Sequence, residues 1–190
     1  MNTLLKFLEN RRSAKIALLG APGPDASELG QILKVAARVP DHKRMVPWRF
    51  IVFDGDSRAK FGDRLAEILV KESEEAPSTV RLETERQRFL RAPLVVAVVS
   101  RITDTRVVPE WEQVLSAGAA AFNLCLAANA LGYGTAWVTE WYAFSRGADD
   151  ALGLGDGERV AGFVYVGTEQ ERQPDRERPD MEAIVTHWQG

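Results

Sequence analysis

The sequence predicts a sheet flanked by helices, in a fold of the α+β or α/β class. Segments with helical periodicity alternate irregularly with short apolar runs that are typical of strands. Residues 94–99 form a nearly unbroken apolar, mostly β-branched run, which suits a strand buried on both faces. The 190 residues are 45% hydrophobic and 27% charged, which is enough apolar material for a core. Because no repeat or interdomain linker is visible, we expect a single domain over residues 1–190.

The first half of the chain is expected to contain four helices and two strands. Three leucines within residues 4–8 recur at helical spacing, and Asp25 or Ser27 can cap the second helix. Pro40 should end that helix, because proline disfavours the helical conformation of the residue before it. The expected helices are 2–12, 25–38, 57–75 and 79–90, and the expected strands are 48–53 and 94–99.

The second half is dominated by a long helix expected over residues 111–131. This segment is small and apolar on almost every side, so it should be covered on several sides. Gly132 follows it directly, as is typical of a helix end. Strands over 135–139 and 160–166, a short helix over 145–153, and an extended polar arm over 168–190 that regains apolar residues near its end complete the prediction.

Composition and charge argue against several broad classes of protein. The net charge of −3 gives no extended basic footprint for nucleic acid or an anionic membrane. Cys125 is the one cysteine, so no internal disulfide and no zinc cluster are expected, and its apolar neighbours predict a buried thiol. We see no signal peptide and no apolar window long enough to span a bilayer, so we expect a cytoplasmic location.

Arg11-Arg12-Ser13 is the first candidate ligand site. Two guanidinium groups and a hydroxyl within three residues can hold a phosphate. The alternative is that the two arginines form a cationic last turn that complements the dipole of the preceding helix.

Two further segments are candidate binding sites. The loop over residues 38–48 places basic side chains and His42 between two prolines, which suits a ligand-binding loop or simply a solvated basic loop. The glycines of the segment 132–137 would let a flat ligand approach the backbone, although a helix cap followed by a turn explains them equally simply.

The sequence offers little reactive machinery of its own. It contains no dinucleotide-binding or phosphate-loop glycine motif and no nucleophile elbow, and its second histidine, His187, lies near the C-terminus. We therefore expect no catalytic side chain and no metal site, and chemistry supplied by a bound cofactor. Most of the carboxylates singled out are expected on solvated faces; these are Glu110, Glu112, Glu140, Asp149 and Asp150.

Six short motifs occur in a characteristic order along most of the chain. They are Asn10–Ser13, Arg38–Lys43 leading into Pro47–Phe50, Arg91–Leu94, Pro109–Gly118, Gly132–Trp137 and Gly162–Thr168. Taken together, they resemble the nitroreductase family of flavoproteins, and most closely its small bacterial NAD(P)H nitroreductases. This resemblance implies an α+β fold with three α/β/α layers and a mixed, largely antiparallel sheet. It also implies an intertwined homodimer with FMN at the interface and the arm 168–190 reaching the partner.

The resemblance also implies which residues contact the cofactors. For FMN they are Arg11, Arg12 and Ser13 at the phosphate and ribityl chain, Arg38 and His42 from the proline-fenced loop, and Trp137, Val138 and Thr139 along the other side of the flavin. For the nicotinamide nucleotide they are Ala127, Ala128, Asn129, Ala130, Leu131 and Gly132, where core packing is the alternative role. The first two FMN groups would form one wall and the third another.

The implied activity is a ping-pong reaction. NADH or NADPH would give a hydride to FMN, and an electron-poor small molecule such as a nitroaromatic or a quinone would then be reduced. One alternative is a flavin-binding protein with a storage, sensing or narrow biosynthetic role. Another is a non-flavin protein whose basic loop binds a phosphorylated metabolite.

The chain departs from the family pattern at several positions. Val46 stands where glutamine is common, and Val138-Thr139 stands where close relatives tend to have Arg-Ser. Both changes remove a polar contact to the flavin. Arg176 and Arg178 make the arm unusually basic, and they either reach the phosphate of the partner's FMN or remain solvated.

Overall fold

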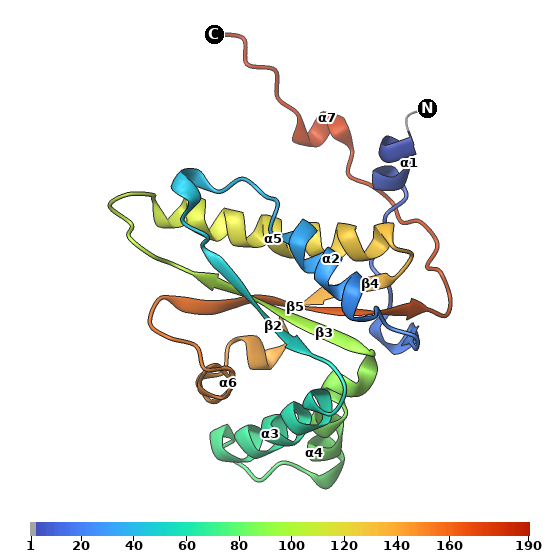
Figure 1. Cartoon of the computed structure of the whole chain (residues 1–190), viewed down its shortest axis with the longest axis vertical. Helices are drawn as coiled ribbons and strands as arrows, with labels where there is room; N and C mark the ends of the chain where they lie inside the picture. Colours follow the sequence, from blue (N-terminus) through green and yellow to red (C-terminus); the bar gives the residue numbers. More distant parts are fainter. Residues whose placement is uncertain (1–2) are drawn as a thin grey trace.

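The computed structural model describes residues 3–190 and shows a sheet between two layers of helices (Figure 1). Within these residues the sheet has five strands, in the order β1-β5-β3-β2, and β4 also pairs with β5. All four pairings are antiparallel, which confirms the α+β class and the largely antiparallel sheet. The strands are β1 (Leu19–Gly20), β2 (Trp48–Phe53), β3 (Leu94–Arg101), β4 (Gly134–Val138) and β5 (Glu158–Glu169).

Strand β3 lies at the centre of the sheet and is buried on both faces, as its run of apolar residues predicts. It pairs with β2 on one side and β5 on the other. Because successive side chains point to opposite faces, Val95 and Ala97 belong to one core, and Val96 and Val98 to the other. The sheet therefore separates two distinct hydrophobic cores.

Helices α2 (Ala26–Ala36) and α5 (Glu110–Ala130) cover one face of the sheet. Their shared core contains Ile32, Leu124 and Ala128, packed against Val96 of β3. Asp25 caps α2 as predicted, since its carboxylate accepts a hydrogen bond from the backbone N–H of Glu28 at 2.8 Å. The buried half of α5 thus anchors this layer.

Helices α3 (Ser57–Glu72), α4 (Thr79–Arg86) and α6 (Arg146–Leu152) form the layer on the opposite face. An aromatic cluster fills the core beneath them. The ring of Phe89 lies 4.8 Å from that of Phe53 and 4.7 Å from that of Phe61, and Tyr142 and Phe163 pack on its other sides. Such tilted and edge-on aromatic packing is favourable beyond the area it buries.

Several predicted boundaries differ from the observed ones. The helix expected over 79–90 is split into α4 and a 3₁₀ turn, Arg88–Arg91, and 3₁₀ turns also form at Ile16–Leu18, His42–Arg44 and Trp141–Ala143. Strand β1 was missed because two residues carry no periodicity. Its pairing with Thr168 and Glu169 lengthens β5, so the arm begins at residue 170 and not at 168.

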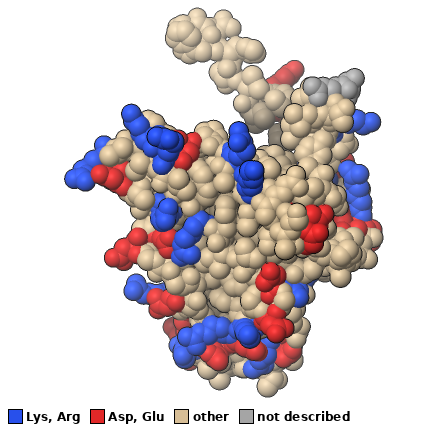
Figure 2. Space-filling model, viewed as in Figure 1, with Lys and Arg blue, Asp and Glu red and all other residues tan. Residues whose placement is uncertain are grey.

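The two ends of the chain project beside each other from the body of the protein (Figure 1). Helix α1 (Thr3–Glu9) has no buried residue, and residue 2 of the expected helix 2–12 lies outside the described residues. The arm ends in one short helix, α7 (Met181–Ile184). Figure 2 shows charged side chains crowded over α3 and α4, whereas Glu182 is the one Asp, Glu, Lys or Arg residue in 181–190.

Among the described residues, α5 is the one helix long and apolar enough to cross a membrane. The expectation that no such window exists was therefore wrong. Half of the window is buried inside the protein, which is the behaviour of a central core helix. The expectation that α5 is covered on several sides holds only in part. Four large side chains remain exposed along it, which are Trp111, Leu115, Phe122 and Leu131.

Candidate functional site

Arg11 and Arg12 line a cavity of about 420 Å³ between α1 and the C-terminal end of α5. The guanidinium of Arg11 lies 5.7 Å from the centre of the Phe122 ring, and Arg12 donates a hydrogen bond to the carbonyl of Pro174. Among residues 3–190 neither guanidinium forms an ion pair with a carboxylate. The other lining residues are Phe7, Asn10, Asn129, Gly132, Tyr133, Glu169 and Arg172. Three arginines facing one glutamate give this cavity a net positive charge.

Ser13 is exposed, and the backbone next to it fixes the position of the arginines. The N–H of Ala14 donates to the carbonyl of Thr135 at 2.8 Å, which ties the Arg11–Ser13 segment to β4. The short β1 follows and pairs with the end of β5. The basic segment is thus held against the sheet by main-chain bonds and not by its side chains.

The proline-fenced loop lies at the other end of α5, beside a cavity of about 340 Å³. Nδ1 of His42 is 2.7 Å from Oε2 of Glu112, and the hydroxyl of Ser116 donates to the carbonyl of Pro40 at 2.5 Å. Glu112 was expected on a solvated face, and that interpretation was incomplete because its carboxylate is half-exposed but engaged. Leu115 and Ala119 make most of the remaining wall apolar.

The backbone of this loop is strained. Lys43, Arg44 and Val46 have φ angles of 59°, 56° and 49°, a left-handed region that is particularly unfavourable for a β-branched residue. The carboxylate of Asp41 accepts a hydrogen bond from the N–H of Val46 at 3.1 Å and holds the turn together. Each such residue costs about 1–3 kcal/mol, and such conformations cluster at functional sites.

Arg38 follows α2 and is exposed. Its carbonyl accepts a hydrogen bond from the side-chain amide of Asn123 at 3.3 Å, so its backbone is fixed against the middle of α5. Its guanidinium has no partner among residues 3–190. Arg38 therefore resembles Arg11 and Arg12 in carrying an uncompensated positive charge.

The segment Trp137–Thr139 is divided between the two faces of the sheet. Trp137 lies on the α5 side, 40% exposed, and its indole N–H donates to the carbonyl of Ala161 at 3.2 Å. A Cβ on Gly162 would lie 1.8 Å from that nitrogen, so glycine makes room for the indole. Val138 instead packs against the aromatic core, and Thr139 is exposed.

The segment predicted to contact the nicotinamide nucleotide is divided as well. Ala127 and Ala128 are buried in the core, whereas Ala130 and Leu131 are exposed. Of the six residues, Asn129 and Gly132 reach the cavity that contains Arg11. Gly132 has a φ of 94°, as expected for a glycine at a helix end.

The two cavities lie at opposite ends of α5. Glu112 and Asn129 are separated by about 25 Å along the helix axis at 1.5 Å per residue. One chain therefore does not bring Arg11–Ser13 together with His42 in the single wall that we expected. Arg38, beside Asn123, lies between the two ends.

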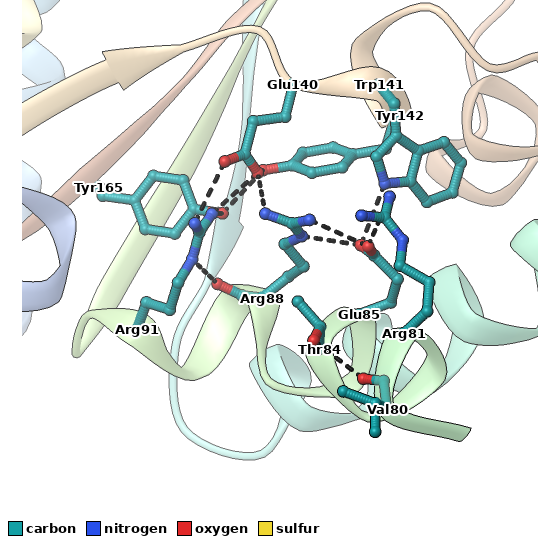
Figure 3. A network of polar contacts seen from close by, with 10 residues as sticks. All are labelled: Val80, Arg81, Thr84, Glu85, Arg88, Arg91, Glu140, Trp141, Tyr142 and Tyr165. Carbon is teal, nitrogen blue, oxygen red and sulfur yellow. Dashed lines mark hydrogen bonds and ion pairs between the residues drawn. The ribbon is translucent and has the colours of Figure 1, made fainter. Parts of the chain in front are cut away.

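A buried network of charges lies on the opposite face of the sheet, as Figure 3 shows. Arg88 donates two hydrogen bonds to Glu85, at 2.7 and 2.9 Å, and a third to Glu140 at 3.1 Å. Arg91 donates to both carboxylate oxygens of Glu140 and to the hydroxyl of Tyr165 at 2.9–3.1 Å. Glu140 was expected on a solvated face, and that prediction was wrong because its partners lie 49 and 52 residues away.

The environment of this network favours the ionised carboxylates. Burial raises the pKa of Glu85, but hydrogen bonds from Arg88 and Trp141 outweigh it and hold the pKa below its usual value. The pKa of Glu140 is likewise lowered by Arg91 and Tyr142 against the effect of burial. Glu85 is fully buried, so this is a completed structural network and not an open site.

Cys125 is buried, as predicted. Burial raises the pKa of its thiol to about 11, which disfavours the reactive thiolate. The thiol is therefore a core residue and not a nucleophile.

Residues 8–168 match the model of the nitroreductase family. The chain belongs to this family. Its relatives include the Escherichia coli K12 protein named "Putative NAD(P)H nitroreductase YdjA", 34% identical over 97% of this chain and 98% of the relative. A Haemophilus influenzae protein named "Putative NAD(P)H nitroreductase" is 35% identical over 88% of this chain and 89% of the relative.

Solved structures share the fold. A nitroreductase-like family protein from Bacillus cereus has a TM-score of 0.84 at 21% identity, and the match covers 100% of this chain and 98% of the other. A nitroreductase with bound FMN from Bacteroides fragilis NCTC 9343 has a TM-score of 0.69 at 20% identity, with 100% of both chains covered. Both likenesses confirm the nitroreductase fold predicted from the motifs.

Proposed function

We propose that this nitroreductase-family protein is an FMN-dependent NAD(P)H oxidoreductase that reduces electron-poor acceptors, such as nitroaromatics or quinones, by ping-pong hydride transfer. The observation that carries the proposal is that Arg11, Arg12 and Arg38 have no carboxylate partner among residues 3–190. Guanidinium groups left without an anion at a cavity suit the phosphate of a flavin nucleotide. The names of the curated relatives and the FMN bound to the Bacteroides fragilis structure support the same assignment.

The residues present fit such a cofactor. Arg11, Arg12 and Ser13 would hold the phosphate and ribityl chain, and Trp137 offers a flat apolar surface on the α5 side of the sheet. Arg38 and His42 would contact the flavin from the loop, with Val138 and Thr139 supplying main-chain groups. When bound, FMN accepts a hydride from NADH or NADPH and passes it to the acceptor. Positive charge beside the ring would stabilise its reduced, anionic form.

The proposal includes a homodimer. The exposed apolar side chains of α5 favour burial against a partner, and an isologous contact would pack two α5 helices antiparallel. That arrangement would place the Arg11 cavity of one subunit near the His42 loop of the other, which one chain cannot do. The exposed Met181 and Ile184 suggest that the arm reaches the partner. We place the protein, as one domain over residues 1–190, in the cytoplasm.

The nicotinamide assignment is proposed in a narrower form. Asn129 and Gly132 line the basic cavity, so they are the members of the segment 127–132 that could meet a nucleotide. The buried alanines of that segment serve packing.

A visible spectrum of the purified protein, before and after addition of FMN, tests the cofactor assignment. Bound flavin should appear in the wild type, and stopped-flow mixing with NADH or NADPH should bleach it before a quinone restores it. A protein that acquires no flavin absorbance contradicts the proposal. Flavin that neither nucleotide reduces would instead indicate a binding, storage or sensing role.

A further inference from the structure

The contact between His42 and Glu112 joins the proline-fenced loop to the first turn of α5. Nδ1 of the imidazole lies 2.7 Å from the carboxylate of a residue 70 positions away. Asp41 is the nearer carboxylate in sequence, but it accepts from the N–H of Val46. Ser116 holds the same loop through the carbonyl of Pro40. The loop is therefore fixed on α5 in a way that presents His42 to Glu112 in particular.

This contact determines what the imidazole can offer a ligand. An ionised carboxylate only accepts hydrogen bonds, so a neutral His42 carries its proton on Nδ1 and a lone pair on Nε2. Nδ1 is engaged by Glu112, which leaves Nε2 as the free ring nitrogen. The adjacent cavity of about 340 Å³ is lined by Pro40, Leu115 and Ala119 besides the polar groups. An apolar wall with a few placed polar groups is the usual form of a small-molecule site.

We propose that Glu112 is a positioning residue that fixes His42 as its Nδ1–H tautomer, so that Nε2 accepts a hydrogen bond from an N–H or O–H group of a flat, uncharged ring at this cavity. The inference rests on the proposed function, in which that ring belongs to the flavin or to the acceptor. The tautomer itself depends on neither, because both residues belong to the same chain.

Nitrogen-15 NMR of the histidine-labelled, cofactor-free protein measures the tautomer directly. At a pH where both imidazoles are neutral, His42 should be in the Nδ1–H form, and the exposed His187 gives an internal reference. Glu112→Ala should shift His42 to the pattern of His187. Glu112→Gln should retain the Nδ1–H form, because the amide oxygen still accepts. Glu110→Ala is the matched control, since Glu110 is exposed on the same turn and has no partner among residues 3–190.

A wild-type His42 that resembles His187, or one that does not respond to Glu112→Ala, would overturn the proposal. A second measurement identifies the ligand, using flavin fluorescence for the Kd of FMN and steady-state assays for the KM of p-benzoquinone. Glu112→Ala should raise one of the two about fivefold, the upper range for a half-exposed pair, and Glu112→Gln should raise it less. A change in Kd assigns the bond to flavin, and a change in KM alone assigns it to the acceptor.

If neither constant changes, no ligand lies against Nε2 and the proposal fails. A wild type that binds no FMN overturns the proposed function instead, and the tautomer shift then supports or overturns the role of Glu112 independently.

Discussion

The two faces of the sheet treat their charged residues in opposite ways. On the face under α3 and α4, Arg88 and Arg91 are largely buried, and each is paired with a carboxylate. On the α5 face, Arg11 and Arg38 have no carboxylate partner among residues 3–190. Both sets were visible in the sequence as arginines within motifs. The difference teaches that pairing, and not residue type, separates a structural arginine from one available to a ligand.

The energetics of the two faces should differ accordingly. Removing one member of a buried ion pair leaves the other charge unpaired and costs about 3–5 kcal/mol. Removing an unpaired, partly exposed guanidinium changes the stability of the fold little, but it removes a contact to the ligand. Substitutions on the two faces can therefore separate stability from binding.

The largest expected effect is on stability. Glu140→Ala should lower the free energy of unfolding by about 3 kcal/mol, because Arg88 and Arg91 lose their shared partner in a buried setting. Urea denaturation measures the change. Glu67→Ala, which removes one side of an exposed pair with Arg64, should cost less than about 1 kcal/mol. Equal losses in the two variants would show that the network is not structural.

The next effect is on binding. Arg11→Ala should weaken FMN binding about 30-fold, as expected for a charge-assisted hydrogen bond of about 2 kcal/mol, and should leave the urea midpoint nearly unchanged. Flavin titration followed by fluorescence gives the Kd. Arg64→Ala is the matched control on the other face and should bind FMN like the wild type. An unchanged Kd in Arg11→Ala would remove the arginine cavity from the flavin site.

A smaller effect concerns acid. Both Glu85 and Glu140 have a lowered pKa in the folded protein, so their ionised forms contribute stability above about pH 4.3, the ordinary value for Glu. That contribution is lost as the pH falls through the lowered, folded-state pKa values. Urea midpoints between pH 6 and pH 3 should fall less steeply for Glu140→Gln than for the wild type. Parallel curves would mean that Glu140 does not titrate with unfolding.

The smallest effect comes from the strained loop on the α5 face. Val46→Gly should stabilise the protein by about 0.5–1 kcal/mol, because relief of the positive φ exceeds the entropy cost of glycine. Thermal unfolding detects the change. Val80→Gly, at an exposed helical position, should act in the opposite direction by about 1 kcal/mol. A destabilising Val46→Gly would show that the loop backbone is not strained.

Local patterns predicted the elements well. The apolar run of β3, the capping residue Asp25 and the buried Cys125 are all confirmed, because each depends on neighbours in sequence. The two-residue β1 has no period to detect, and its pairing depends on residues almost 150 positions away.

The candidate site was predicted only in part for the same reason. Arg11, Arg12 and Trp137 were found through motifs, whereas the partner of His42 lies 70 residues further along the chain. Nothing near Glu112 or Glu140 in the sequence signals that its carboxylate is engaged. The separation of the two cavities along α5 follows from the packing of the whole chain, so no single motif could reveal it.

The pairing of β1 with the end of β5 has a consequence for local unfolding. Arg172 donates to the carbonyl of Asn10, Arg12 donates to that of Pro174, and the N–H of Gln170 donates to that of Leu18. The first and last segments of the chain are therefore fastened to each other as well as to the sheet. They should open as one cooperative unit, so that fraying of the arm would also release the arginines at the other end of the chain.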